Sequence, residues 1–358
     1  MGEAEVTRSQ LVALLPGALF CVAIAVVSYA TWLAYKPISG LMWAFIYSIV
    51  IANLAKLPKR LAPGINFCSK ELLRGVISAL GIVTSALIWI QVGVGVINAL
   101  VIIFFSYFFG LWLGRKVGLS NTLASLIGVG TSICGASAIA AAGPAIEAKE
   151  EEIGLALACI TLFGLLAMFT YPFLYTNTIV GEWLGHNPNV YSIWCGSGVH
   201  ETAQVIAAAG ALDSAAIGPA LMVKSIRIFM IGPMVLIATY FFSKKEKIAR
   251  GKSAAKTVLP AFAVVFILNS FVGAFLDAYT PQIRAMGFDW SLVKPLLSGN
   301  VFPFLLATAF AGVGSKVKFK DIAKLGAKPF ALGAFMALLA GVLALILAIA
   351  VAPFVPSL

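Results

Sequence analysis

Long apolar runs separated by short polar or basic segments account for most of the chain. A helix of about 20 apolar residues crosses a bilayer core about 30 Å thick, so each run of about this length predicts a membrane span. The pattern predicts eleven spans, at residues 11–35, 41–55, 72–90, 95–113, 121–146, 153–175, 191–212, 216–242, 257–276, 292–313 and 330–354. The fold class that we expect is therefore an all-α polytopic membrane protein.

Composition and charge agree with this pattern. The chain is 61% apolar and only 11% charged, whereas soluble domains are roughly 45–50% apolar and 25% charged. The net charge of +11 does not indicate a nucleic-acid partner, because the basic residues stand in short loops between spans. These loops follow the second, fourth, eighth and tenth spans, at 56–74, 115–116, 244–256 and 316–328. The positive-inside rule then predicts a cytoplasmic N-terminus and an external C-terminus for this multi-pass protein.

The stretch 128–148, GVGTSICGASAIAAAGPAIEA, is unusual for a membrane span because nearly all of its residues are small. Glycine costs roughly 1 kcal/mol relative to alanine inside a helix, so we expect the helix at 121–146 to be broken in its middle. The broken part is a candidate substrate site that offers amides, hydroxyls and a thiol, from Gly130, Thr131, Ser132, Cys134, Gly135 and Ser137. The basic loops also allow an alternative in which 121–146 and 191–212 are re-entrant loops that enter from opposite faces.

Residues 1–40 form an additional N-terminal span in this reading, because their apolar run exceeds the roughly 7–15 residues of a signal-peptide core. The remaining ten spans divide into two sets of five that begin on opposite sides of the membrane. This predicts two inverted five-helix repeats, 41–176 and 191–358, a plan found in many secondary transporters. The broken fifth span then corresponds to the tenth, where PLLSGNVFPF at 295–304 interrupts an apolar run and adds Asn300 as a candidate ligand. The alternative is that glycine and proline only kink a helix there.

Ionisable residues within the spans are few, and such residues are functional candidates by default. GVHETAQV places His200, Glu201 and Gln204 near the middle of the seventh span, and Lys224 and Arg227 stand one turn apart in the eighth. If Glu201 neutralises one cation and His200 is uncharged, one positive charge remains, which favours an anionic substrate. The alternative is a closed ion-pair cluster that holds two spans together.

Two stretches resemble enzyme signature motifs but lack residues that those motifs require. HETAQ at 200–204 has glutamine where the zinc-protease motif HExxH needs a second histidine, so we expect no metal site. The glycine-rich stretch lacks the lysine of a P-loop, and the five cysteines contain no CxxC pair. Neither zinc hydrolysis nor nucleotide hydrolysis is supported, and we expect no cofactor and no disulfide framework.

Five specific segments, spread over nearly the whole chain, carry a family resemblance. They are GTSICGASAIAAAGPAI at 130–146, TYP at 170–172, VHETAQV at 199–205, VKSIR at 223–227 and FAGVGSKVKFKDI at 310–322. Together they resemble the YeiH family of proposed sulfate exporters. That family is similar to the bile acid and sodium symporter superfamily, whose fold has two inverted five-helix repeats, a panel domain and a core domain with two crossing discontinuous helices. The resemblance implies a multi-pass anion carrier of the inner cell membrane, with residues 130–138, 200–205, Lys224 and Arg227 at its site. It also favours the spanning form of 121–146.

We therefore expect a secondary transporter of a small anion that works by alternating access around a site near the membrane midplane. Glu201 and His200 are the candidate coupling pair, because histidine titrates near neutral pH and a buried carboxylate can take up a proton. The expected partners are the anion, the lipid bilayer, a coupling H⁺ or Na⁺ and, left open, a second copy of the chain. A passive anion channel and a membrane-embedded enzyme are the alternatives.

Overall fold

The computed structural model describes residues 8–35, 38–84, 86, 93–242, 261–324 and 326–355. Over these residues the regular structure is helical, and six helices are long and apolar enough to cross a membrane. Several shorter apolar helices accompany them. The all-α polytopic fold that the apolar runs predict is therefore confirmed. The predicted basic loop at 244–256 lies outside the described residues.

The chain folds as two compact units, each formed from two separate stretches of sequence. Unit 1 comprises Met1–Ser85 with Val265–Phe319, and unit 2 comprises Ala86–Val264 with Lys320–Leu358. Each unit thus contains segments of both predicted repeats, so the repeats at 41–176 and 191–358, which stay a prediction, do not coincide with the compact units. Two of the three points where the chain passes from one unit to the other lie within helices, α16 (Ala261–Ala278) and α20 (Phe319–Ala323).

Unit 1 is built around the pairing of α2 and α19. Its helical elements are α1 (Arg8–Ala34), α2 (Gly40–Leu54), η1 (Lys59–Leu61), α3 (Ala62–Phe67), η2 (Cys68–Leu72), α4 (Leu73–Val83), α17 (Thr280–Ala285), α18 (Trp290–Leu296), η5 (Leu297–Val301) and α19 (Phe302–Lys316). Phe45 of α2 meets Phe310 of α19 edge-on, with 6.0 Å between ring centroids. Gly314 allows the close approach, because a Cβ there would lie 2.1 Å from Ser48 Oγ.

The predicted interruption at 295–304 is wrong, because the chain is helical throughout this stretch. α18, the π-helical turn η5 and α19 follow one another directly, and the residues at the two junctions have helical dihedral angles, φ −62° and ψ −44° at Leu296 and φ −68° and ψ −56° at Val301. Pro303 is the second residue of α19 and directly follows the π-helical turn η5. A π turn is a place where a helix takes up a local irregularity such as the hydrogen bond that proline cannot donate.

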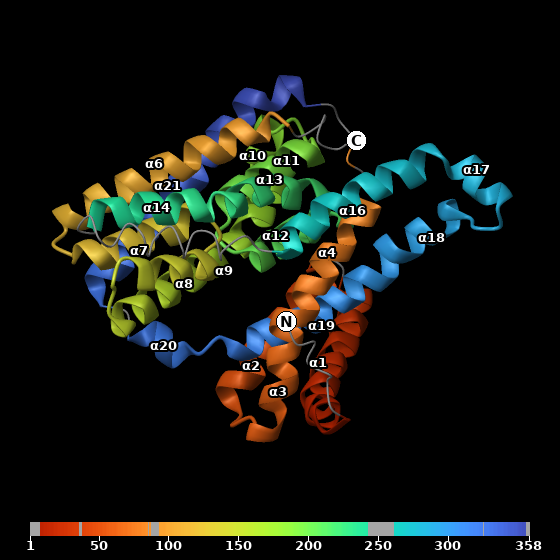
Figure 1. Cartoon of the computed structure of the whole chain (residues 1–358), viewed down its shortest axis with the longest axis horizontal. Coiled ribbons are helices and arrows are strands. Elements are labelled where there is room, and N and C mark those ends of the chain that lie inside the picture. Colours follow the sequence, from red (N-terminus) through yellow and green to blue (C-terminus); the bar gives the residue numbers. More distant parts are fainter. Residues whose placement is uncertain are drawn as a thin grey trace. The chain divides into compact units, whose positions relative to one another are not determined.

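Unit 2 is a bundle whose members include two pairs of short helices where a membrane protein would ordinarily have two long ones. Its helical elements are α6 (Gly95–Lys116), α7 (Asn121–Ser132), α8 (Ala136–Ala145), α9 (Glu150–Asn177), α10 (Val180–Trp183), α11 (Pro188–Gly198), α12 (Thr202–Leu212), η3 (Ser214–Ala216), α13 (Ile217–Phe229), α14 (Ile231–Phe242), α21 (Ala327–Val351) and η6 (Ala352–Phe354). Figure 1 shows α6 and α21 side by side, and both contact α7. Hence α7 is enclosed, and its residues from Leu123 to Ser132 are all buried.

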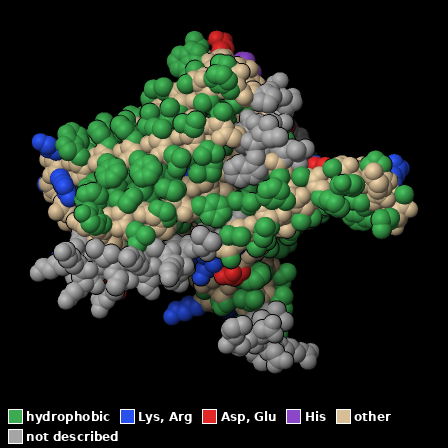
Figure 2. Space-filling view, turned by 45° about the horizontal axis from the view of Figure 1, so that its top comes forward, with side chains coloured by type: hydrophobic (Ala, Val, Ile, Leu, Met, Phe, Trp, Pro, Cys, Tyr) green, Lys and Arg blue, Asp and Glu red, His purple; other side chains and the backbone are tan. Residues whose placement is uncertain are grey.

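The outer surface of these helices is apolar, as expected for contact with lipid. Exposed side chains on α6 include Ile97, Phe104, Phe108 and Trp112. In Figure 2 hydrophobic side chains cover much of the visible described surface, and charged side chains appear only in a few small groups. An exposed apolar area of this extent indicates a bilayer environment.

Candidate functional site

The first break lies between α7 and α8, at 133–135, within the stretch where the sequence predicts it. α7 ends at Ser132, and Ile133 leaves helical geometry with φ −116° and ψ −103°. Gly135 follows with φ 71° and ψ −117°, a conformation that L side chains rarely adopt. A Cβ on Gly135 would also lie 2.6 Å from Glu201 Cγ. Both constraints require glycine at this position.

The second break lies between α11 and α12, inside the predicted span 191–212. α11 ends at Gly198, Val199 is extended with φ −75° and ψ 142°, and Glu201 is extended with φ −100° and ψ 148° before α12 begins at Thr202. The sequence does not signal this break, which takes the place of the interruption predicted at 295–304. Unit 2 therefore contains two discontinuous helices.

Lys224 and Arg227 of α13 join the two breaks by donating hydrogen bonds to backbone carbonyls. The Lys224 ammonium donates to Ile133 O at 2.8 Å, Val199 O at 2.9 Å and His200 O at 2.5 Å. The Arg227 guanidinium donates to carbonyls at the ends of both α7 and α11, namely Thr131 at 2.5 Å, Ser132 at 3.0 Å, Val199 at 3.2 Å, Gly196 at 3.4 Å, and Ser197. The last carbonyls of a helix have no helical donor and form the negative end of its dipole. Two fixed cations thus cap two helix C-termini at once.

This geometry bears on the prediction that Lys224 and Arg227 contact the substrate. Both side chains are 0% exposed. An ammonium group has three hydrogens, and those of Lys224 are directed at three carbonyls. The structure brings the two cations to the breaks, as predicted, but it places carbonyl oxygens where the prediction places the anion.

The N-terminal ends of α8 and α12 carry the second half of the site. The first intrahelical bonds there are donated by Ile139 to Gly135 O at 3.1 Å and by Val205 to Glu201 O at 2.9 Å. The N–H groups before these donors have no helical acceptor and form the positive ends of the two helices, which are 10 and 11 residues long. Exposed N–H groups at a helix N-terminus are a suitable environment for an anion.

Glu201 is the carboxylate next to these two N-terminal ends. Thr161 of α9 donates its hydroxyl to Glu201 Oε1 at 3.3 Å. Gln204 accepts from the Glu201 backbone N–H at 3.1 Å and donates to Thr161 O at 3.3 Å, so α9 and α12 are tied together. Gly164 leaves room for this amide, because a Cβ there would lie 1.9 Å from Gln204 Oε1. Within the described ranges Glu201 makes no ion pair.

Accessibility separates the candidate residues into two groups. Ser137 is exposed, and Thr161, Glu201 and Thr202 are partly exposed. The other predicted residues of the breaks are buried, namely Gly130, Thr131, Ser132, Cys134, Gly135, His200 and Gln204. The accessible part of the site is therefore at the N-terminal ends of α8 and α12, and the cations lie behind it.

Several buried polar atoms close to the breaks have no hydrogen-bond partner among the described residues. They are both ring nitrogens of His200, Thr131 Oγ1, Ser197 Oγ and the Tyr171 hydroxyl. Tyr171 stacks on Trp194 with 4.1 Å between ring centroids, and its hydroxyl lies against Gly198, where a Cβ would be 2.5 Å away. Buried polar groups are nearly always paired, so each exception calls for an explanation. A site that exchanges ligands or protons is such an explanation.

Comparison with known proteins defines the family. The family model described as "Conserved hypothetical protein 698" matches residues 16–333. The chain belongs to this family. It is 30% identical over 313 residues to a UPF0324 membrane protein of Bacteroides thetaiotaomicron, covering 85% of this chain and 87% of that protein. It is 31% identical over 318 residues to one of Corynebacterium glutamicum, covering 88% and 87%, and 29% identical over 339 residues to one of Pseudomonas aeruginosa, covering 92% of each.

The matched family is the one also called YeiH or UPF0324, so membership in it confirms the predicted resemblance. The relatives' names support the membrane assignment. One predicted ligand belongs to the other compact unit. Asn300 is exposed and belongs to η5 of unit 1, whereas all residues at the two breaks belong to unit 2.

Sequence reasoning missed Thr161, Thr202, Ser197 and Tyr171 as members of the site. Thr202 and Tyr171 had a signal, because they stand inside the HETAQ and TYP motifs. Thr161 comes from α9, a long apolar helix, and only the fold brings it next to the breaks.

Proposed function

We propose that this protein is a secondary transporter of a small anion that works by alternating access. The observation that carries the proposal is the pair of discontinuous helices whose carbonyl ends are capped by Lys224 and Arg227 and whose amide ends begin at Ala136 and Thr202. Discontinuous helices of this kind form substrate sites in secondary transporters. Alternating access also requires two parts that move against each other, and the chain has two compact units.

The sign of the charge at the breaks supports an anion. Lys224 and Arg227 contribute two positive charges, and Glu201 contributes one negative charge when ionised. Each helix end carries roughly half an elementary charge, so the two C-terminal and two N-terminal ends at the breaks cancel. One positive charge is left over, in a region from which much of the water is excluded. Sulfate or a related small inorganic or organic anion is the substrate class that we propose, following the family resemblance.

We place the substrate at the N-terminal ends of α8 and α12. There backbone N–H groups that have no helical acceptor, apart from that of Gln204, which the Glu201 carboxylate caps, can donate to it together with the hydroxyls of Ser137, Thr161 and Thr202. These three side chains are at least partly exposed. Lys224 and Arg227 would act on the anion through their charge, without contact, because their hydrogens are directed at carbonyls.

The arrangement also favours a proton over Na⁺ as the coupling ion. In sodium-coupled carriers, carbonyls at unwound helices and half-helix C-termini coordinate the ion. Here the Lys224 ammonium already donates to the carbonyls of Ile133, Val199 and His200. The Arg227 guanidinium also donates to Val199. Glu201, by contrast, is a carboxylate beside the proposed anion site, so an arriving anion and an ionised Glu201 repel each other. A proton on Glu201 removes that repulsion, which couples proton and anion movement. His200 is the second candidate carrier of the proton.

The test is uptake of radiolabelled sulfate into liposomes that contain the purified protein. We expect saturable uptake that is driven by a pH gradient and unchanged when Na⁺ is replaced by a large organic cation. Ser137→Ala should raise the KM about tenfold or more, because a hydrogen bond to a charged group contributes about 1.5–3 kcal/mol. Ser291→Ala, which removes an exposed hydroxyl of unit 1, is the matched control and should leave the KM unchanged.

Three results would contradict parts of the transporter proposal. If the wild-type protein moves no sulfate or related anion under any pH or Na⁺ gradient, the transporter proposal is wrong. Single-channel currents in a planar bilayer would instead identify a passive channel. Uptake that requires Na⁺ would overturn the argument from the capped carbonyls while leaving anion transport intact.

A further inference from the structure

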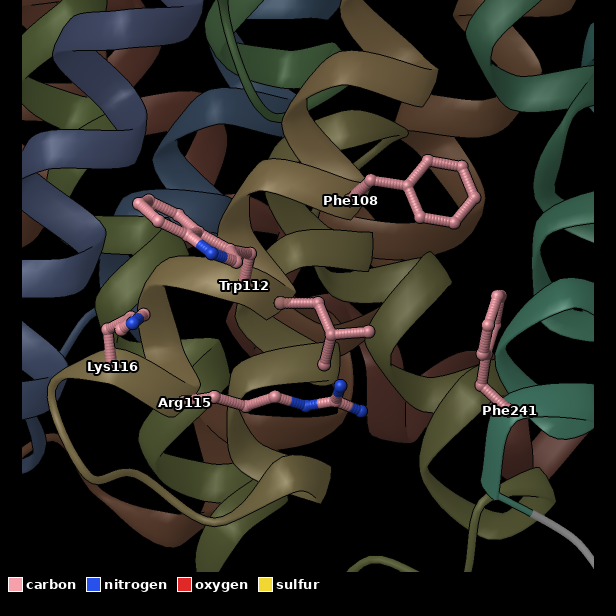
Figure 3. A pocket seen from close by; sticks show the side chains of 6 residues that line it. Phe108, Trp112, Arg115, Lys116 and Phe241 are labelled. Atoms are coloured by element: carbon pink, nitrogen blue, oxygen red, sulfur yellow. The ribbon is translucent and has the colours of Figure 1, made fainter.

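A pocket outside the helix breaks lies at the surface of unit 2, where α6 ends beside the end of α14. It has a volume of about 390 Å³ and is lined by Phe108, Leu111, Trp112, Arg115, Lys116 and Phe241. Figure 3 shows Phe108 and Trp112 on α6, Phe241 opposite them on α14, and Arg115 extended across the lower side toward Phe241. Phe108 and Phe241 meet edge-on with 5.9 Å between ring centroids. None of these residues belongs to the helix breaks.

The charged residues among the described lining residues of this pocket are both cations. Arg115 and Lys116 are exposed, and no carboxylate is among these described lining residues. Arg115 uses Nε to donate to Asn121 Oδ1 at 2.8 Å, which orients the guanidinium and leaves its terminal N–H groups for another acceptor. Figure 3 shows the Arg115 guanidinium on the Phe241 side and Lys116 on the other side, near Trp112. A guanidinium suits a phosphate group, and an ammonium at the same helix end adds positive charge. By the positive-inside rule this end of α6 lies in the cytoplasmic leaflet.

The apolar side of the pocket continues into a groove along α6. The groove has a volume of about 720 Å³, is lined by apolar side chains from Leu100 to Trp112, and shares Phe108 and Trp112 with the pocket. At 1.5 Å per residue, this part of α6 is about 18 Å long. One leaflet of a bilayer core about 30 Å thick measures about 15 Å. The groove thus has the length of a lipid chain in one leaflet, and it starts at the two cations.

We propose that this pocket and groove bind an anionic phospholipid of the cytoplasmic leaflet. Its phosphate accepts from the terminal N–H groups of Arg115, Lys116 adds positive charge at the same helix end, and one acyl chain follows the groove past Phe108 and Phe104. Trp112 stands at the junction, where an indole is well suited to the boundary between headgroup and chain. A free phosphate ion would use the cations but not the apolar groove, whose side chains are partly exposed over its whole length. This site is independent of the proposed transport function.

The experiment is native mass spectrometry of the whole purified protein titrated with phosphatidylglycerol or phosphatidylcholine. We expect selective binding of phosphatidylglycerol, tighter with long acyl chains than with short ones. Since each basic residue near a membrane surface contributes about 1 kcal/mol, the double variant Arg115→Gln with Lys116→Gln should bind phosphatidylglycerol about 30-fold more weakly. The matched control is Lys70→Gln with Arg74→Gln, an exposed basic pair of unit 1, which should bind as the wild type does.

Other results of the lipid titration would overturn the proposal or change the ligand. Equal affinity for the two lipids, or equal loss in both double variants, would overturn the proposal. Competition by inorganic phosphate together with indifference to chain length would replace the lipid with a free anion. If the double variant does not yield folded protein, the single variant Lys116→Gln and the chain-length series on the wild type still decide the matter.

Discussion

Replacing Lys224 by methionine tests whether a fixed cation holds the two helix breaks together. Methionine has a similar length and no charge, so the substitution removes the donor and leaves most of the volume filled. The carbonyls of Ile133, Val199 and His200 then lose the ammonium group, which bonds to each of them at 2.5–2.9 Å. Arg227 still donates to Val199, but among the described residues of α13 no side chain other than Lys224 donates to Ile133 or His200.

The expected cost follows from those carbonyls. A buried polar group left without its partner costs about 1–3 kcal/mol, and removing a buried charge recovers part of its desolvation. A net loss of about 3–5 kcal/mol is expected, which corresponds to a melting temperature lower by roughly 10 °C at about 2–4 °C per kcal/mol. Thermal unfolding followed by fluorescence in detergent measures this shift.

The control for Lys224→Met is Lys294→Met. Lys294 also carries a bound ammonium, paired with Asp277 at 2.8 Å, but its side chain is 33% exposed. A partly exposed pair contributes at most about 1 kcal/mol, so this variant should melt within a few degrees of the wild type. If Lys224→Met melts like Lys294→Met, the ammonium does not stabilise the breaks, and the capping argument is refuted.

Three further substitutions test separate parts of the site. Gly135→Ala should destabilise unit 2 by about 2 kcal/mol or more in the thermal unfolding assay, because it combines φ 71° with a Cβ 2.6 Å from Glu201 Cγ. The control is Gly299→Ala, whose Cβ meets nothing within 4 Å. This variant should be neutral or slightly stabilising in the same assay. Gly164→Ala should displace the Gln204 amide and lower transport without changing oligomeric state, measured as sulfate uptake and by size-exclusion chromatography. Glu201→Gln should abolish the dependence of sulfate uptake on a pH gradient, and retention of that dependence would assign the coupling proton elsewhere.

The fold class and one of the two breaks could be predicted from the sequence because both depend on local composition. Apolar runs long enough to cross a bilayer become helices such as α6, α9 and α21 with ends close to the predicted ones. The break at 133–135 is encoded by Gly135, whose positive φ no other residue adopts easily, within a stretch of small side chains.

The second break could not be predicted because tertiary contacts create it. Residues 191–212 contain no proline, and the glycines at 196 and 198 lie inside α11 or at its end, so the local sequence permits a continuous helix. The donors that satisfy its unwound carbonyls come from α13, about 25–30 positions later in the chain. Conversely, 295–304 has glycine, asparagine and proline yet remains helical, because a π turn directly before α19 takes up the local irregularity.

The two cations of α13 connect the local structure of the breaks to the sign of the proposed substrate. Without them, the helix ends would cancel and Glu201 would make the site negative when ionised, whereas with them the site has one positive charge in excess. Because both cations donate to carbonyls, they remain fixed when the substrate leaves, and the empty site keeps its preference for an anion. A carrier that filled the same carbonyls with Na⁺ would lose that preference each time the ion departed. Fixed cations therefore suit a transporter in which only a proton on Glu201 needs to change between the loaded and the empty state.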